Sequence, residues 1–145
     1  MLGYYKMPKE TKEMFTEDGW LKTGDIGELT EDNQLFITGR VKNLIILSNG
    51  ENVSPEAIEK KFADNQLVSE VLVYGEKNRI IAEIYPDYEY AKLEGIDDIQ
   101  GELEKTVDRM NKTAKAAHII SEVRVRTEPL EKTGSGKIKR KATVL

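Results

Sequence analysis

The apolar periodicity of residues 97–117 constrains the fold more than any other feature of this sequence. Apolar side chains recur there every three or four residues, which places them on one face of an α-helix. They are Ile99, Leu103, Val107, Met110, Ala114 and Ala117. A chain of 145 residues has room for about one domain. The rest of the chain must therefore supply the apolar surface that this helix covers.

Short strands separated by turns are predicted on both sides of the helix. Residues 69–74 and 79–85 predict a hairpin, and residues 44–47 and 123–125 predict further strands. In the second hairpin strand, apolar residues alternate with polar ones, so one face should be buried. Ser54 precedes a proline and should cap a helix by accepting hydrogen bonds from its first free amides. This order predicts an α/β (α+β) fold, with a short mixed sheet flanked by helices.

The first 42 residues differ in character from the rest. Residues 8–15 predict a short helix, and residues 26–30 and 35–38 predict a hairpin around a polar turn. The glycine-led segment Gly39-Arg40-Val41-Lys42 follows and marks a boundary. We expect residues 1–41 to be the β-rich end of a larger N-terminal domain, and residues 43–145 to form a small C-terminal domain.

Several classes of protein are excluded by composition. The chain has no cysteine and one histidine, His118, which excludes disulfides, a thiolate nucleophile and metal sites built on cysteine or paired histidines. We expect no bound metal. No apolar run approaches the ~18 residues of a membrane span, and the N-terminus lacks the apolar stretch of a signal peptide. We expect a cytoplasmic protein with no integral membrane span.

Charge is distributed unevenly along the chain. The net charge is −4, yet residues 132–145 contain five basic residues and no acidic one. This basic end could meet an anionic ligand, or it could be a solvated tail. A nucleic-acid contact is a further alternative, although the tail has no interleaved aromatic residues. We expect no nucleic-acid partner.

Glycines mark three segments that could carry chemistry. The segment Thr133-Gly134-Ser135-Gly136-Lys137 fails the test for a phosphate-binding P-loop, because Glu131 stands where the first glycine belongs and Ile138 where a hydroxyl residue belongs. Residues 131–137 should form a mobile loop that carries Lys137 to a phosphate or carboxylate. Asp25 follows Gly24 and could hold two ribose hydroxyls, or it could be a turn aspartate. Arg40 could bind a phosphate, or it could form a surface ion pair.

Together, the order and spacing of these motifs closely resemble the acyl-adenylate-forming superfamily, which includes acyl-CoA synthetases, luciferases and adenylation domains. The resemblance extends over essentially the whole chain and rests on six ordered motifs: Gly3-Tyr4-Tyr5-Lys6, the pair Pro8 and Thr11, residues 19–25, residues 39–42, residues 50–59, and residues 132–138. Proline usually precedes the Lys-Thr of the last motif, and Glu131 stands there instead, which suggests a looser loop.

The resemblance implies a role for five residues. In such enzymes a carboxylic acid attacks ATP to give acyl-AMP and pyrophosphate, and CoA then takes the acyl group. Asp25 matches the residue that holds the AMP ribose, and Arg40 matches one that supports ribose and phosphate. Lys137 matches the lysine that bridges carboxylate and α-phosphate. Lys42 matches the hinge of the C-terminal domain, or it could be a plain surface lysine. Gly50 matches a glycine beside the pantetheine passage.

The resemblance also implies what this chain lacks. The phosphate-binding loop and the acyl pocket of the family belong to a large N-terminal domain, so we expect residues 1–145 alone to be inactive and to bind no cofactor. The full-length enzyme would use ATP, CoA and Mg²⁺. The motifs are most similar to those of bacterial long-chain fatty acid:CoA ligases. The alternative is a stand-alone regulatory or interaction module that uses the basic tail.

Overall fold

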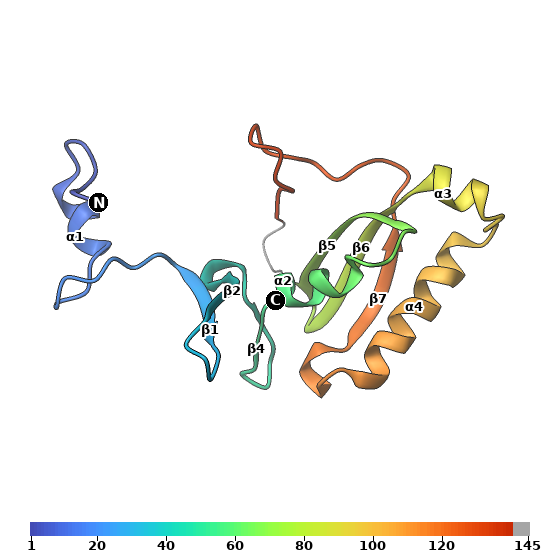
Figure 1. Ribbon diagram of the computed structural model, residues 1–145, viewed down its shortest axis with the longest axis horizontal. Helices are drawn as coiled ribbons and strands as arrows, with labels where there is room; N and C mark the ends of the chain where they lie inside the picture. The colour runs from blue at the N-terminus through green and yellow to red at the C-terminus, as the bar shows by residue number, and fades with distance from the viewer. Residues whose placement is uncertain (141–145) are drawn as a thin grey trace.

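The computed structural model of the protein describes residues 1–140, so Lys141 of the basic tail and the last residues of the predicted C-terminal domain lie outside it. The first elements are helix α1 (Pro8–Glu13) and the antiparallel hairpin of β1 (Asp25–Leu29) and β2 (Leu35–Arg40). Figure 1 shows α1 set apart from the rest of the chain, with a connecting segment that leads into β1. The predicted short helix and hairpin are confirmed.

The segment after β2 turns repeatedly before it reaches the main sheet. It contains the 3-10 turn η1 (Val41–Asn43) and the short antiparallel pair β3 (Ile45–Ile46) and β4 (Asn52–Val53). Helix α2 (Pro55–Glu59) follows and continues as the 3-10 turn η2 (Lys60–Phe62).

The predicted cap of α2 is wrong in its detail. The Ser54 side chain accepts no hydrogen bond from the helix amides. Its hydroxyl donates instead to the carbonyl oxygen of Thr38 at 3.0 Å and to Glu56 at 3.1 Å. The hydroxyl that the local sequence predicts as a helix cap therefore donates to a carbonyl of another element instead.

The centre of the molecule is a mixed three-stranded sheet in the order β5-β6-β7. Strand β5 (Val68–Glu76) pairs antiparallel with β6 (Arg79–Pro86), which pairs parallel with β7 (Ile120–Val125). The prediction of one buried face on the middle strand is wrong, because Ile81 and Glu83 are buried as well as the alternate apolar residues. A central strand that is covered on both faces buries nearly all of its side chains.

Two helices connect β6 to β7. Helix α3 (Tyr88–Leu93) and helix α4 (Ile99–Thr113) are each capped by an aspartate, Asp87 or Asp98, whose side chain accepts from an amide of the first turn. Helix α4 is shorter than predicted, because Ala114 adopts an extended conformation and residues 116–118 form the 3-10 turn η3. Figure 1 shows α4 running alongside the sheet.

Each face of the sheet has its own apolar cluster. The larger cluster joins one sheet face to α2, η2, α3 and α4, and it includes Phe62, Val73, Ile84 and Leu103. The smaller cluster lies on the other face and comprises Leu72, Tyr74, Ile81 and Leu130, with Ile138 packed against it. The chain segment after β7 therefore crosses back over the sheet and covers this second face, as the red segment in Figure 1 shows.

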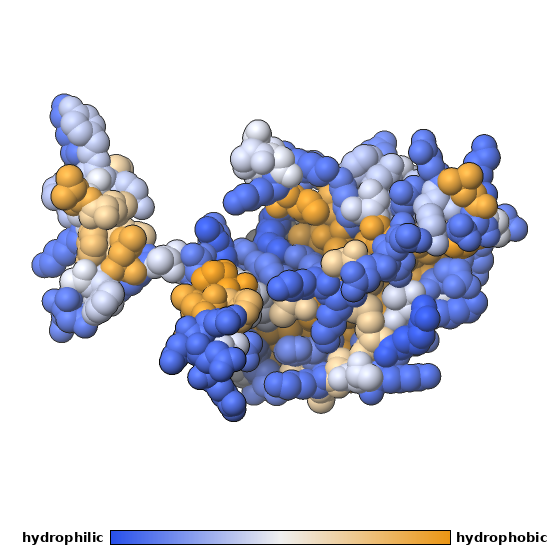
Figure 2. Space-filling view, viewed as in Figure 1, coloured by the Kyte–Doolittle hydropathy of each residue, from blue (hydrophilic) through white to orange (hydrophobic). Residues whose placement is uncertain are grey.

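Apolar side chains remain exposed in the N-terminal third. Tyr5 and Trp20 near α1 and Leu29, Leu35 and Ile37 on the β1–β2 hairpin are among the large exposed ones. Figure 2 shows orange patches on the two N-terminal lobes, where aliphatic side chains are exposed. Within the described part of the chain, no helix is long and apolar enough to span a bilayer.

Candidate functional site

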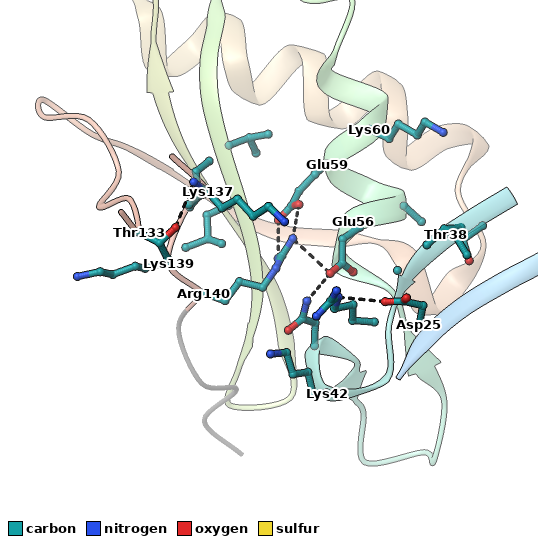
Figure 3. Close-up of a pocket in the computed structure, with 18 of the residues that line it drawn as sticks. Asp25, Thr38, Lys42, Glu56, Glu59, Lys60, Thr133, Lys137, Lys139 and Arg140 are labelled. Carbon is teal, nitrogen blue, oxygen red and sulfur yellow. Dashed lines mark hydrogen bonds and ion pairs between the residues drawn. The ribbon is translucent and has the colours of Figure 1, made fainter. Parts of the chain in front are cut away.

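A cleft of about 1420 Å³ lies where the β1–β2 hairpin, η1, α2 and residues 133–140 meet. It brings together four of the five predicted site residues: Asp25, Arg40, Lys42 and Lys137. Figure 3 shows Asp25 of β1 and Lys42 of η1 in the same view as Lys137, which lies about 95 residues or more further along the chain.

Asp25 and Arg40 face each other across the hairpin. They are register partners in the β1–β2 ladder, and Arg40 Nε lies 3.0 Å from Asp25 Oδ1. Gly24, just before Asp25, has a φ of +72°, which favours glycine and allows the turn into β1. Of the two alternatives for Arg40, the structure shows the surface ion pair, and this pair lines the cleft.

Residues 131–139, which we call the lysine hairpin, are folded back on themselves. The amide of Thr133 donates to the carbonyl of Lys137 at 2.7 Å, and the amide of Lys139 donates to the carbonyl of Glu131 at 2.7 Å. Residues Lys132 and Ile138 form a β-bridge between the two sides. The predicted loop contains no helix or strand, but it is closed into a hairpin whose tip holds its glycines.

The first foot of the lysine hairpin is held by Glu70 of β5. Its carboxylate accepts from the Leu130 amide at 2.7 Å and pairs with Lys132 Nζ at 2.5 Å. Partial burial raises the pKa of Glu70, but the hydrogen bonds and charge of Lys132 and the Leu130 amide lower it below its usual range. Leu130 itself is buried in the second apolar cluster.

The second foot is held by α2. Arg140 donates two hydrogen bonds to Glu59, from Nη1 to Oε1 at 2.9 Å and from Nη2 to Oε2 at 2.7 Å. Glu59 also accepts from the Val73 amide at 2.8 Å. Such a bidentate pair fixes orientation as well as distance.

Lys137 differs from the other basic residues of its own segment, residues 132–140. Lys132 pairs with Glu70, Lys139 with Glu131, and Arg140 with Glu59. Within the described residues, Lys137 forms no ion pair, and its side chain is exposed in the cleft. Most of the basic charge here thus holds the hairpin in place, and the ammonium group of Lys137 is left for a ligand.

Sequence reasoning missed the residues that join β2 to α2. Gly39 is buried, and a Cβ there would clash with Ser54 Oγ and lie 2.9 Å from Glu56 Oε2. Glu56 also accepts from Asn43 in η1 at 2.5 Å. The glycine of the Gly39-Arg40 motif could have indicated that another segment approaches the backbone closely at this position. Only the fold shows that this segment is the start of α2.

The structure separates Gly50 from the other predicted residues. Gly50 lies in the exposed turn between β3 and β4, outside the cleft, and has a φ of +82° with open space around its Cβ position. Lys42 is exposed in η1, between the β1–β2 hairpin and the small sheet β3–β4. His118 also lies outside the cleft.

The cleft can bind anions through charge and hydrogen bonding. Lys42, Lys60 and Lys137 line it together with the Asp25–Arg40 pair. Its other carboxylates, Glu56 and Glu59, already contact Arg140. Mg²⁺ binds to oxygen ligands, and the carboxylates among the described residues of the cleft are already paired with arginine. These residues therefore do not fit a magnesium site. Residues 1–140 contain no cluster of three potential metal ligands.

Sequence comparisons find one family model and several named relatives that the chain resembles. Residues 42–145 match the model described as the AMP-binding enzyme C-terminal domain. The chain is 44% identical over 78 residues to Long-chain-fatty-acid–CoA ligase 1 of Schizosaccharomyces pombe, covering 54% of this chain and 12% of that protein. It is 34% identical over 122 residues to Probable acyl-activating enzyme 16, chloroplastic, of Arabidopsis thaliana, covering 72% and 17%.

Solved structures share the fold. One is the A domain of a carboxylic acid reductase from Segniliparus rugosus, in complex with AMP and a co-purified carboxylic acid. It matches with a TM-score of 0.77 and 26% identity over 95% of this chain and 23% of that one. ATP-bound MatB from Rhodopseudomonas palustris matches with a TM-score of 0.71 and 26% identity over 94% and 26%. The chain thus spans between 12% and 26% of the length of these four proteins.

Proposed function

The chain belongs to the AMP-binding enzyme C-terminal domain family, and from this premise we propose that it is the C-terminal part of an ATP-dependent acyl-CoA synthetase. The proposed substrate is a long-chain fatty acid, because relatives named as long-chain fatty-acid–CoA ligases or long-chain acyl-CoA synthetases share 40–45% identity with the chain over 76–89 residues. We propose that residues 1–41 end a large N-terminal domain, residue 42 is the hinge and residues 43–145 form the C-terminal domain.

In the first proposed step, a carboxylate oxygen of the acid attacks the α-phosphorus of ATP. The bond to the β-phosphate oxygen breaks, which releases pyrophosphate and leaves acyl-AMP. Negative charge gathers where carboxylate and phosphate meet, and a correctly placed cation stabilises it. The observation that supports this role for Lys137 is that its ammonium group faces the cleft without an ion pair among the described residues.

The Asp25–Arg40 pair is proposed to hold the nucleotide at this cleft. A carboxylate has two acceptor oxygens for the two ribose hydroxyls, and the guanidinium group can donate to ribose or phosphate oxygens. The two side chains lie 3.0 Å apart, so one nucleotide could contact both. These two residues take part in no other proposed step.

In the second proposed step, the thiol sulfur of CoA attacks the acyl carbonyl and AMP leaves. We propose that the C-terminal domain rotates about Lys42 between the steps and brings the Gly50 turn to the pantetheine passage. The location of Gly50 outside the cleft supports two separate working faces. Mg²⁺ would accompany ATP through oxygen ligands that this chain does not provide, and the site of action would be the cytoplasm.

The proposal is tested by a chimera in which this chain replaces the corresponding segment of the Schizosaccharomyces pombe ligase. Lys137→Ala should lower ATP–pyrophosphate exchange about 100- to 1,000-fold, because one aligned charge is lost from the transition state. Lys139→Ala, in the same hairpin, should change it little. Exchange that survives Lys137→Ala within a factor of three would contradict the role of Lys137.

The chain alone provides a second test. Residues 1–145 should catalyse neither pyrophosphate exchange nor CoA-ester formation above the level of their own Lys137→Ala variant, because the phosphate-binding loop and acyl pocket are expected in the larger domain. Activity above that level would show that the cleft is sufficient and that the proposed division of labour is wrong.

A further inference from the structure

Two carboxylates line the cleft beside the free lysine. Glu56 and Glu59 lie one helical turn apart on α2, and their side chains are 25% and 16% exposed. Figure 3 shows the Lys137 side chain pointing toward Glu59 and Arg140. An ammonium group on a flexible stem is drawn to a nearby unpaired carboxylate. Without a counter-charge, these carboxylates would therefore compete with an anionic substrate group for Lys137.

Arg140 forms ion pairs with both carboxylates. Its guanidinium group makes the bidentate pair with Glu59 and also lies 3.4 Å from Glu56 Oε1. The remaining contacts of the two carboxylates are with uncharged groups, namely the Val73 amide, Asn43 and Ser54. Burial opposes the charged form of Arg140, but the hydrogen bonds and charge of Glu59, with the charge of Glu56, raise its pKa. One arginine therefore supplies the charge compensation for both carboxylates.

We propose that Arg140 is a positioning residue that keeps the two α2 carboxylates occupied and so leaves the Lys137 ammonium group available to an anionic substrate group. This inference rests on the proposed role of Lys137. Without Arg140, Glu59 would keep its place, because the Val73 amide still holds it, but it would lack a counter-charge. Lys137 would then pair with Glu59 instead of with substrate.

A purely mechanical role for Arg140 gives a different expectation. If Arg140 only anchored the hairpin, removing Glu59 as well could not repair the loss of Arg140. If Arg140 acts as a counter-charge, Glu59→Gln should repair the loss, because the carboxylate toward which Lys137 points is gone and the glutamine oxygen can still accept from Val73. Glu56 keeps its hydrogen bonds with Asn43 and Ser54 in that variant. The other foot of the hairpin, at Glu70, remains in every variant.

The experiment measures the reactivity of Lys137 in the 145-residue chain, so it requires no enzymatic activity. A limiting amount of acetic anhydride labels lysines at fixed pH, and mass spectrometry of the digested chain gives the fraction labelled at each site. Lys60 is the internal reference because it is exposed and lines the same cleft. Arg79→Ala is the matched control, because it removes one arginine from an ion pair, with Glu122, outside the cleft.

Arg140→Ala should lower the labelling of Lys137 relative to Lys60 by about two- to fivefold, the range of a solvent-accessible ion pair. Arg140→Ala combined with Glu59→Gln should restore it, and Arg79→Ala should leave it unchanged. Arg140→Gln gives the same test if the alanine variant does not fold. Unchanged Lys137 labelling in Arg140→Ala and Arg140→Gln, or a fall that Glu59→Gln does not reverse, would overturn the proposal. Either result leaves the pyrophosphate-exchange test of Lys137 independent.

Discussion

At the scale of single residues, contacts between distant segments decide what a side chain does. Ser54 has the identity and setting of a helix cap, yet its hydroxyl donates to Thr38, sixteen residues earlier. The glycine beside Thr38 leaves room for this approach, because a Cβ at position 39 would clash with Ser54. Local sequence identifies the glycine and the serine as special, but it cannot show that they are special for each other.

Gly39→Ala should destabilise the chain by about 1–3 kcal/mol, because the added methyl group forces β2 away from α2. Urea unfolding followed by circular dichroism measures the change. Gly134→Ala is the control: a Cβ at position 134 meets no heavy atom within 4 Å, so its free energy of unfolding should change by no more than about 0.5 kcal/mol. Equal changes in the free energy of unfolding at the two positions would show that the close approach of Ser54 to Gly39 does not affect stability.

At the scale of elements, the sequence predicted the hairpins, the central sheet strands and the long helix because their periodicity is local. It did not predict the closed form of the lysine hairpin, where two glycines suggested a mobile loop. That hairpin is ordered by Glu70 and Glu59, which lie about 60 and 80 residues before the groups they bind. The candidate site was found from motif order, whereas the ion pairs that position it could be found only from the fold.

The anchor at Glu70 predicts a pH dependence. Because folding lowers the pKa of Glu70 below 4.5, its contribution to stability is present above that value and is lost as the pH falls through the lower folded-state pKa. Glu70→Gln should therefore lower the free energy of unfolding at neutral pH by about 1–2 kcal/mol. The difference from the wild-type chain should shrink below pH 4.5.

Chemical unfolding at a series of pH values measures this dependence. Glu31→Gln is the matched control, since Glu31 is exposed in the β1–β2 turn and has no ion pair among the described residues. A difference between Glu70→Gln and wild type that stays constant with pH would contradict the assigned cause.

At the scale of the whole molecule, the buried core is confined to one part of the chain. Every buried hydrophobic side chain of the described residues lies between Ile45 and Leu130. The N-terminal third, in contrast, exposes many of its large apolar residues, including Trp20 at 71%. This distribution agrees with the proposal that residues 1–41 are completed by a larger domain.

The single tryptophan reports on this division. Because Trp20 is already solvated in the folded chain, its emission maximum should barely move when urea unfolds the sheet, although circular dichroism records the transition. A control variant with Trp20→Phe and Phe62→Trp places the only tryptophan in the core, and its emission should shift to longer wavelength. A comparable shift from Trp20 itself would mean that the N-terminal third buries it.

The double anchoring of the lysine hairpin has an entropic consequence. Fixing the backbone of a free loop costs about 1–2 kcal/mol per residue, and a nine-residue loop that ordered only on meeting its substrate would lose much of its binding energy in that way. Here the chain meets that cost when it folds. What remains to be immobilised at the moment of reaction is one lysine side chain, about 2 kcal/mol, so most of the interaction energy is left to act on the reacting atoms.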